Sequence, residues 1–129
     1  MKKKKSIVII GYGSIGQKHH KILKKHKNIY QIYVISKHIK EKFFVRRNLK
    51  YIKSLNPHYI VISSKTSDHY KNLYFIEKNF KNKIILIEKP LFDKFRFLKI
   101  KKNKVFVGYN LRFHPVINYI KKFIQNKKL

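Results

Sequence analysis

Short apolar runs rich in β-branched residues recur along the chain and predict buried strands. Near-continuous apolar runs of this length are typical of strands covered on both faces, as in a parallel sheet. Segments with helical spacing lie between several of them, and this alternation indicates strand–helix–strand units. We therefore predict an α/β fold, a doubly wound Rossmann-type parallel sheet in a single domain. The runs are Ile7–Ile10, Ile32–Ile35, Tyr59–Ile62, Ile84–Ile87 and Val105–Val107.

Three segments carry apolar or semi-apolar residues at the spacing of one helical face. The first helix is predicted from Ser14, and the second from about Thr66, with Thr66 or Ser67 as its N-cap. The third is predicted from Pro115, a residue suited to the first helical position. The inward positions expected in the first two helices are Ile15, His19, Ile22, Leu23 and His26, and Tyr70, Leu73, Ile76 and Phe80; the apolar face of the third consists of Val116, Ile117, Ile120, Phe123 and Ile124.

Two remaining segments are less regular. Residues 37–57 are predicted to hold a short helix, a weak strand and a turn at Asn56-Pro57. Residues 92–103 are basic and irregular, and we expect no regular element there.

The large positive charge of the chain is weaker evidence for an anionic partner than its magnitude suggests. The chain has 129 residues, and 33 Lys and Arg against 5 Asp and Glu give a formal charge of +28, which favours an anionic partner. However, only four of these cations are Arg, Ala is absent, and Lys, Ile, Asn, Phe and Tyr dominate. These five residues have AT-rich codons, so genome bias can supply much of the lysine.

Several classes of protein are excluded or disfavoured by composition. The absence of Cys excludes disulfide frameworks and thiolate metal sites, and with few carboxylates we expect no metal site among the seven His. The apolar run behind the basic start is too short for a signal peptide, and no run approaches the length of a membrane helix. We therefore expect a cytoplasmic protein without a membrane partner.

The clearest motif is Gly11-Tyr12-Gly13-Ser14-Ile15-Gly16, which reads G-x-G-x-x-G between a predicted strand and a predicted helix. Gly11 permits a tight turn, Gly13 a close approach of a pyrophosphate, and Gly16 close packing of helix on strand. The amides that open the helix, from Ser14 and Ile15 onward, then offer unpaired N–H groups to phosphate. The motif predicts a dinucleotide site; a glycine turn without a ligand is the simpler alternative.

The end of the second strand bears on the choice of dinucleotide. An acidic residue about 20 positions after the loop would bind the ribose 2′-hydroxyl of NAD. Counting from Gly16 gives Ser36 beside Lys37, and the nearest carboxylate is Glu41. A hydroxyl next to a cation suits a 2′-phosphate, so we predict NADP, with NAD as the alternative. Against this, Lys37 is one of 29 lysines and can stand there by composition alone.

The motifs resemble, in order and spacing, the N-terminal domain of the Gfo/Idh/MocA oxidoreductase family. The resemblance rests on the glycine loop continued to His19, on Ile62–His69, on Ile87-Glu88-Lys89-Pro90 and on Val107–Pro115. It implies a dinucleotide-binding Rossmann domain over residues 1–110. Residues 111–129 would then be an exit segment and an amphipathic helix at the start of a second domain, which this chain does not contain.

The resemblance also implies roles for individual residues. Lys89 would lie by the nicotinamide and the reacting hydroxyl, where desolvation would favour its neutral amine and let it move a proton. Glu88 would hold Lys89 or the cofactor ribose. Ser64, Thr66 and His69 would contact the nicotinamide half, and Arg112 would face the cofactor or the substrate domain.

The function implied is hydride transfer between a nicotinamide cofactor and a sugar, nucleotide-sugar or polyol. Whether this chain is an enzyme alone stays open, because a partner would have to supply the substrate domain. The apolar stripe of the last helix also needs a partner surface. Two alternatives are an inactive nucleotide-binding fragment and a basic protein that binds nucleic acid non-specifically. Because the lysines are spread along the chain, we expect nucleic-acid binding to be weak at most.

Overall fold

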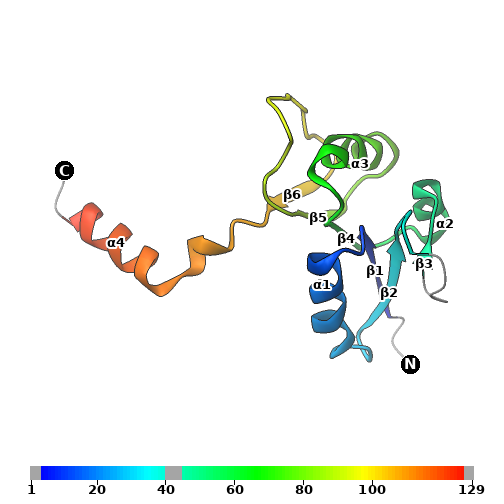
Figure 1. Cartoon of the computed structure of the whole chain (residues 1–129), viewed down its shortest axis with the longest axis horizontal. Helices are drawn as coiled ribbons and strands as arrows, with labels where there is room; N and C mark the ends of the chain where they lie inside the picture. Colours follow the sequence, from blue (N-terminus) through cyan, green and yellow to red (C-terminus); the bar gives the residue numbers. More distant parts are fainter. Residues whose placement is uncertain (1–3, 40–44, 127–129) are drawn as a thin grey trace.

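Six strands form one sheet in the computed structural model, which describes residues 4–39 and 45–126 (Figure 1). Their order is β3-β2-β1-β4-β5-β6, and all neighbours pair in parallel. The order reverses between β1 and β4, so the predicted doubly wound sheet is confirmed. The strands are β1 (Lys5–Ile10), β2 (Tyr30–Ile35), β3 (Val45–Arg46), β4 (Tyr59–Ile62), β5 (Ile84–Ile87) and β6 (Lys104–Val107).

The central strands are buried on both faces, which is why their sequences are almost continuously apolar. One face carries the larger core, in which Ile10, Ile60 and Ile85 pack with residues of two helices. The opposite face carries a smaller cluster around Ile9, Val34 and Val61. The two cores are therefore unequal.

Helices cover the two faces unequally (Figure 1). Helices α2 and α3 contribute Ile52, Leu73 and Ile76 to the larger core, whereas α1 contributes Leu23 to the smaller one. Short 3-10 turns precede α2 and the last helix. The helices are α1 (Ser14–Lys24), α2 (Ile52–Leu55), α3 (Thr66–Asn79) and α4 (Pro115–Asn126), and the turns are η1 (Leu49–Tyr51) and η2 (Asn110–Phe113).

Two local expectations were wrong. The residue that caps α3 is Lys65, whose extended backbone precedes the helix and whose carbonyl accepts from the Asp68 amide; Thr66 is already helical. On α1, the expected inward residues Ile15 and Ile22 are 40% and 58% exposed. Among the described helices that pack on the sheet, α2 and α3 lie on one face and α1 lies on the other. No neighbouring helix therefore covers the flank of α1.

The connection from β5 to β6 has no helix or strand between residues 88 and 103, in agreement with the expected irregular segment. It is tied to α3 by Glu77, a carboxylate with only 8% of its surface exposed. Glu77 accepts hydrogen bonds from the amides of Lys101 and Lys102 at 2.8 and 2.7 Å and from the Asn103 side chain at 2.7 Å. Burial alone would raise the pKa of Glu77, but these hydrogen bonds and the Lys102 charge together lower it.

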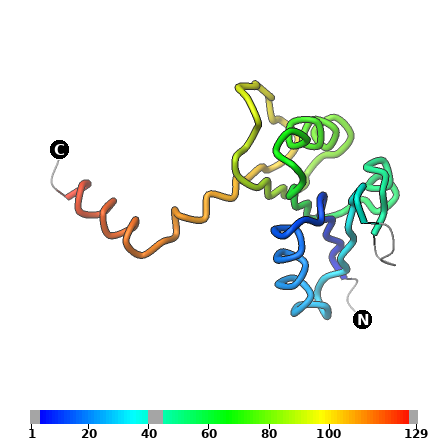
Figure 2. The backbone as a smooth tube through the Cα atoms, viewed as in Figure 1, coloured from blue at the N-terminus to red at the C-terminus, as the bar shows by residue number. Residues whose placement is uncertain are grey.

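The chain leaves β6 as an extended arm that carries α4 away from the sheet (Figures 1 and 2). Every residue from 109 to 126 is exposed. The predicted helix from Pro115 is thus confirmed, while the domain boundary at residue 110 stays a prediction. None of the helices in the described part of the chain has the length and apolar character needed to cross a membrane.

We expect Glu77→Gln to lower the free energy of unfolding by about 1–3 kcal/mol at pH 7, because its amide NH₂ would face the donor of Asn103. The lowered pKa of Glu77 means that its stabilisation is complete above the unfolded value, about 4.3, and is lost as the pH falls below it. Urea denaturation between pH 3 and 7 should show this acid dependence in the parent chain and less of it in Glu77→Gln.

The matched control is Asp93→Asn, which removes one carboxylate charge from an exposed position of the same connection. Exposed ion pairs contribute little, so its stability should change by less than about 1 kcal/mol. Equal losses in the two variants would contradict the role given to Glu77.

Candidate functional site

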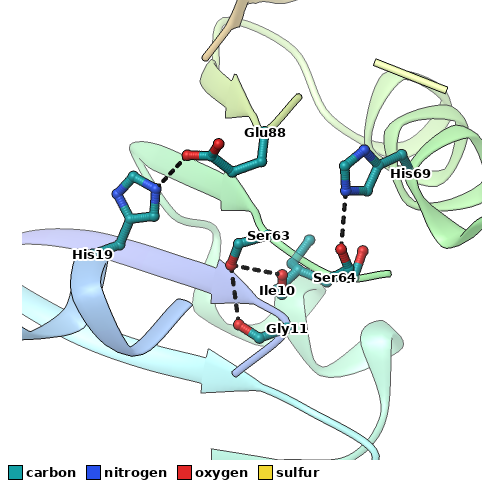
Figure 3. A network of polar contacts seen from close by, with 7 residues as sticks. All are labelled: Ile10, Gly11, His19, Ser63, Ser64, His69 and Glu88. Carbon is teal, nitrogen blue, oxygen red and sulfur yellow. Dashed lines mark hydrogen bonds and ion pairs between the residues drawn. The ribbon is translucent and has the colours of Figure 1, made fainter. Parts of the chain in front are cut away.

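The glycine loop follows β1 at the carboxyl edge of the sheet, where ligands bind in open α/β folds. Gly11 has φ +93°, and a Cβ there would lie 2.4 Å from the backbone of Ser64. Its amide donates to the Ile35 carbonyl at 2.8 Å, and its own carbonyl accepts from Ser63 Oγ at 3.1 Å (Figure 3). The loop is therefore locked between the ends of β2 and β4.

The other two glycines of the loop differ from each other. A Cβ on Gly16 would lie 2.2 Å from the Gly11 carbonyl oxygen, so this position packs helix α1 against the strand end. A Cβ on Gly13 would meet no atom within 4 Å. Space for a close ligand is thus left at Gly13, as the sequence argument requires of the second glycine.

A pocket of about 760 Å³ opens in front of the loop. That volume lies within the usual range for small-molecule sites, about 300–1,000 Å³. It extends from the loop to the end of β2, the segment around η1, the end of β4 and the start of α3. Seven of the predicted site residues line it, namely Gly11, Gly13, Ser14, Ile15, Ser36, Lys37 and Ser64.

The charges of the pocket lining are strongly unequal. Five lysine and arginine side chains line it, against one carboxylate among the described lining residues, that of Asp68. Asp68 belongs to the first turn of α3, not to the end of β2. Glu41, the carboxylate closest to Ser36 along the chain, lies outside the described residues. The cations are Lys37, Arg47, Lys50, Lys65 and Lys71.

Sequence reasoning missed four of these cations. Arg47 and Lys50 follow β3, which β2 pairs through Val34 and Ile35, so the sheet brings them to the end of β2. Nothing in their local sequence separates them from the other lysines and arginines. The weak strand expected within residues 37–57 is present as β3, and its parallel pairing with β2, which the local pattern does not reveal, is what places them.

Six predicted site residues do not line this pocket: Gly16, Thr66, His69, Glu88, Lys89 and Arg112. Gly16 packs against the Gly11 carbonyl within the loop, and Thr66 is the first residue of α3. The remaining four lie at or beyond the ends of α3, β5 and β6, and each has a distinct environment.

Glu88 accepts a hydrogen bond of 2.7 Å from Nε2 of His19, which joins β5 to α1 (Figure 3). His19 is therefore hydrogen-bonded and half-buried. A Cβ on Gly108 would lie 3.1 Å from the same carboxylate. Glu88 thus links the ends of β5 and β6 to the helix that follows the glycine loop.

His69 is 1% exposed and surrounded by carbonyl oxygens. Its Nε2 lies 3.0 Å from the Ser64 carbonyl (Figure 3), and its Nδ1 lies 3.1 Å from that of Pro90 and 3.2 Å from that of Leu91. The ring ties the end of β4 to the segment after Lys89 instead of facing the pocket. The Asn72 amide donates to Ser64 Oγ at 2.9 Å and fixes that hydroxyl at the pocket wall.

Lys89 and Arg112 are both exposed. Lys89 was expected to be buried at the end of its strand. In the structure the segments after β5 and β6 leave its side chain in solvent. Arg112 belongs to η2 on the arm, where its guanidinium lies 5.8 Å from the Phe113 ring.

Strand order, loop and pocket together define a nucleotide-binding Rossmann domain. The model of an oxidoreductase family with an NAD-binding Rossmann fold, Gfo/Idh/MocA, matches residues 5–109. The chain belongs to this family, and residues 5–109 are its NAD-binding domain. No curated protein matches the chain.

Solved structures of similar fold include two WlbA dehydrogenases in complex with NADH and UDP-GlcNAcA. The Bordetella pertussis enzyme is 13% identical with a TM-score of 0.71, over 96% of this chain and 42% of its own. The Chromobacterium violaceum enzyme is 16% identical with a TM-score of 0.74, over 98% and 41%. A Rex-family repressor, RSP, is 14% identical with a TM-score of 0.64, over 98% and 64%. The chain thus spans less than half the length of the similar dehydrogenases.

We expect Gly11→Ala to lower the free energy of unfolding by more than about 2 kcal/mol, because a methyl group at positive φ would also strike the Ser64 backbone. Gly13→Ala is the matched control. Gly13 has φ −71° and open space but is the N-cap of α1, where Ala is less favourable than Gly, so the same methyl should lower stability by no more than about 1 kcal/mol. Urea denaturation measures both, and similar losses in the two variants would contradict the geometry.

Proposed function

We propose that the pocket binds NADP(H) in preference to NAD(H). The observation that carries this is that Ser36 and Lys37 at the end of β2 and Arg47 after the neighbouring β3 line the same pocket. A 2′-phosphate is a dianion with oxygen acceptors, so a hydroxyl and two cations suit it. A ribose with a free 2′-hydroxyl would gain from a carboxylate at this edge, and none of the described lining residues there is acidic.

The pyrophosphate would sit over Gly13, the loop position at which the protein leaves open space. The amides of the first turn of α1 face it there, and the partial positive charge of the helix N-terminus favours a phosphate. Gly11 and Gly16 contribute indirectly, because each close backbone contact holds the loop in the shape that exposes those amides.

We further propose that the domain serves hydride transfer to or from a sugar, nucleotide-sugar or polyol. The bound nicotinamide supplies the hydride chemistry, and the protein supplies position and proton transfer. Lys89 is the residue of this chain suited to move the proton of the reacting hydroxyl. Lys89 is exposed here, so a substrate-binding part that packs against the end of β5 would bury it.

The proposal that a separate part binds the substrate is supported by chain length, since this chain corresponds to 41–44% of the length of the similar dehydrogenases. The UDP-GlcNAcA in the WlbA complexes makes a nucleotide-sugar the first substrate class to test. A cytoplasmic location is part of the same proposal and rests on the sequence analysis alone.

For cofactor choice, we expect Lys37→Ala to weaken NADP binding by about tenfold, close to 1.4 kcal/mol, and to leave NAD affinity nearly unchanged. Calorimetric titration of both dinucleotides at one fixed ionic strength measures this. Tighter binding of NAD than of NADP by the parent chain would overturn the proposed preference.

Two variants serve as controls for that titration. Lys78→Ala removes an exposed lysine from the last turn of α3, away from the pocket lining, and should change neither affinity. Gly13→Ala should weaken both dinucleotides alike, because the pyrophosphate is common to them. Loss of NADP affinity in Lys78→Ala as well would mean that net charge, and not Lys37, determines binding.

For proton transfer, we expect Lys89→Ala to leave the dinucleotide affinity of this chain within about twofold, since Lys89 lies outside the pocket lining. Once the substrate-binding part is supplied, the same variant should lose at least about 100-fold in the rate of hydride transfer, the usual range for a missing proton donor. Nicotinamide absorbance follows the rate. An unimpaired rate would remove Lys89 from the reaction.

A further inference from the structure

The pocket extends from the end of β2 to a part whose walls belong to η1 and α3. Leu49 of η1 and Phe75 of α3 both line it, and both side chains also pack against the larger core. The segment around η1 is teal and α3 is green in Figure 2. We call this part of the pocket the η1–α3 recess; its lining includes Ile39, Leu49, Asp68, Asn72 and Phe75.

The adenine base is the part of the proposed ligand that fits this recess. In NADP the 2′-phosphate and the adenine are carried by the same ribose, so a phosphate at Ser36 and Lys37 keeps the base near the end of β2. The nicotinamide half lies on the other side of the pyrophosphate, and Lys89, the residue proposed to react beside it, is outside the pocket lining. A flat base suits apolar walls that carry a few polar groups. This placement of the base rests on the proposed function.

Asn72 presents an unpaired acceptor to the recess. Only 8% of the residue is exposed, and its Nδ2 donates to Ser64 Oγ at 2.9 Å, which orients the amide. Its Oδ1 has no partner within residues 4–39 and 45–126. This oxygen is not sealed inside the protein, because Arg96 Nε is the buried side-chain polar atom without a partner in those ranges. An unpaired acceptor on a buried amide is unfavourable unless a ligand brings a donor.

Asp68 adds a second acceptor to the same face of α3. It precedes Asn72 by four residues, a spacing that makes two side chains neighbours on a helix surface. Asp68 is half-buried, and its carboxylate has no hydrogen bond or ion pair with the part of the chain that the structure describes. A carboxylate repels phosphate groups. It therefore suits a part of the ligand that carries hydrogen-bond donors and no charge.

We propose that Asn72 and Asp68 select the base of the dinucleotide by accepting hydrogen bonds from the exocyclic amine of adenine. That amine offers two N–H donors. In a hypoxanthine base a carbonyl oxygen stands at the same ring position, and it would face the two acceptors with no proton between them. A site whose polar groups are left unpaired by the wrong ligand rejects that ligand strongly.

The first experiment compares NADP with its hypoxanthine analogue, which differs only by the oxygen in place of the amine. Calorimetric titration of the full 129-residue chain at one ionic strength measures both affinities. We expect NADP to bind at least about tenfold more tightly. Because the two ligands share the 2′-phosphate, the pyrophosphate and the nicotinamide, this ratio of affinities reports on the base alone.

The second experiment removes the acceptors one at a time. Asn72→Leu replaces the amide by an apolar side chain of similar size, and Asp68→Ala removes the carboxylate. Each should lower the ratio of affinities at least about threefold, and the double variant should bring it within about twofold of unity. Loss of the bond to Ser64, or partial unfolding, weakens the two ligands alike and leaves the ratio unchanged.

Asn79→Leu is the matched control for the amide. It makes the same exchange at an exposed position of the last turn of α3, outside the pocket lining. The ratio of affinities should stay at the parent value.

Three results would overturn the proposed base selection. Equal binding of the two ligands by the parent chain would do so and would leave dinucleotide binding itself intact. Tighter binding of the hypoxanthine analogue would mean that Asn72 turns its NH₂ group to the base. A double variant that keeps the parent ratio would assign the selection to other residues. Failure of both ligands to bind would instead contradict the proposed function, and base selection would fall with it.

Discussion

The close packing of backbone at the end of β1 is the constraint on which the site depends. The turn at Gly11 passes so near the end of β4, and Gly16 so near the turn, that neither position has room for a side chain. Ser63 and Ile35 then hold the turn by hydrogen bonds from the two neighbouring strands. The space over Gly13 is a product of this packing, because the strands on both sides fix the direction in which the first amides of α1 point.

Carboxylates are scarce in this chain, and their placement shows how the strand ends are held together. Of the five Asp and Glu in the sequence, Glu77 anchors the long connection before β6, and Glu88 joins β5 to α1. His69 adds a third tie, from α3 to the end of β4 and to the segment after β5. Buried polar groups of this kind stabilise only when their partners are present, so these contacts determine the spacing of the strand ends around the pocket.

The sequence was sufficient for the strands, the glycine loop and the part of the pocket wall formed by that loop and the ends of β2 and β4, because these depend on local pattern. Apolar runs locate strands buried on both faces, and the spacing of Gly11, Gly13 and Gly16 reports backbone contacts within a few residues. Features that depend on distant elements were not predictable in this way. The exposure of Ile22 and of Lys89 follows from the absence of a covering neighbour, and the position of Arg47 follows from the pairing of β3 with β2.

The contact between Gly108 and Glu88 restricts how these two positions can vary. Any side chain at position 108 would meet the carboxylate that holds His19, and the arm leaves the sheet at this same point. A larger residue at 108 would require the Glu88 carboxylate to shift by a few tenths of an ångström, which would disturb its hydrogen bond with His19. Substitutions at position 108 therefore affect the contact between Glu88 and helix α1. Positions 19, 88 and 108 should covary among homologues.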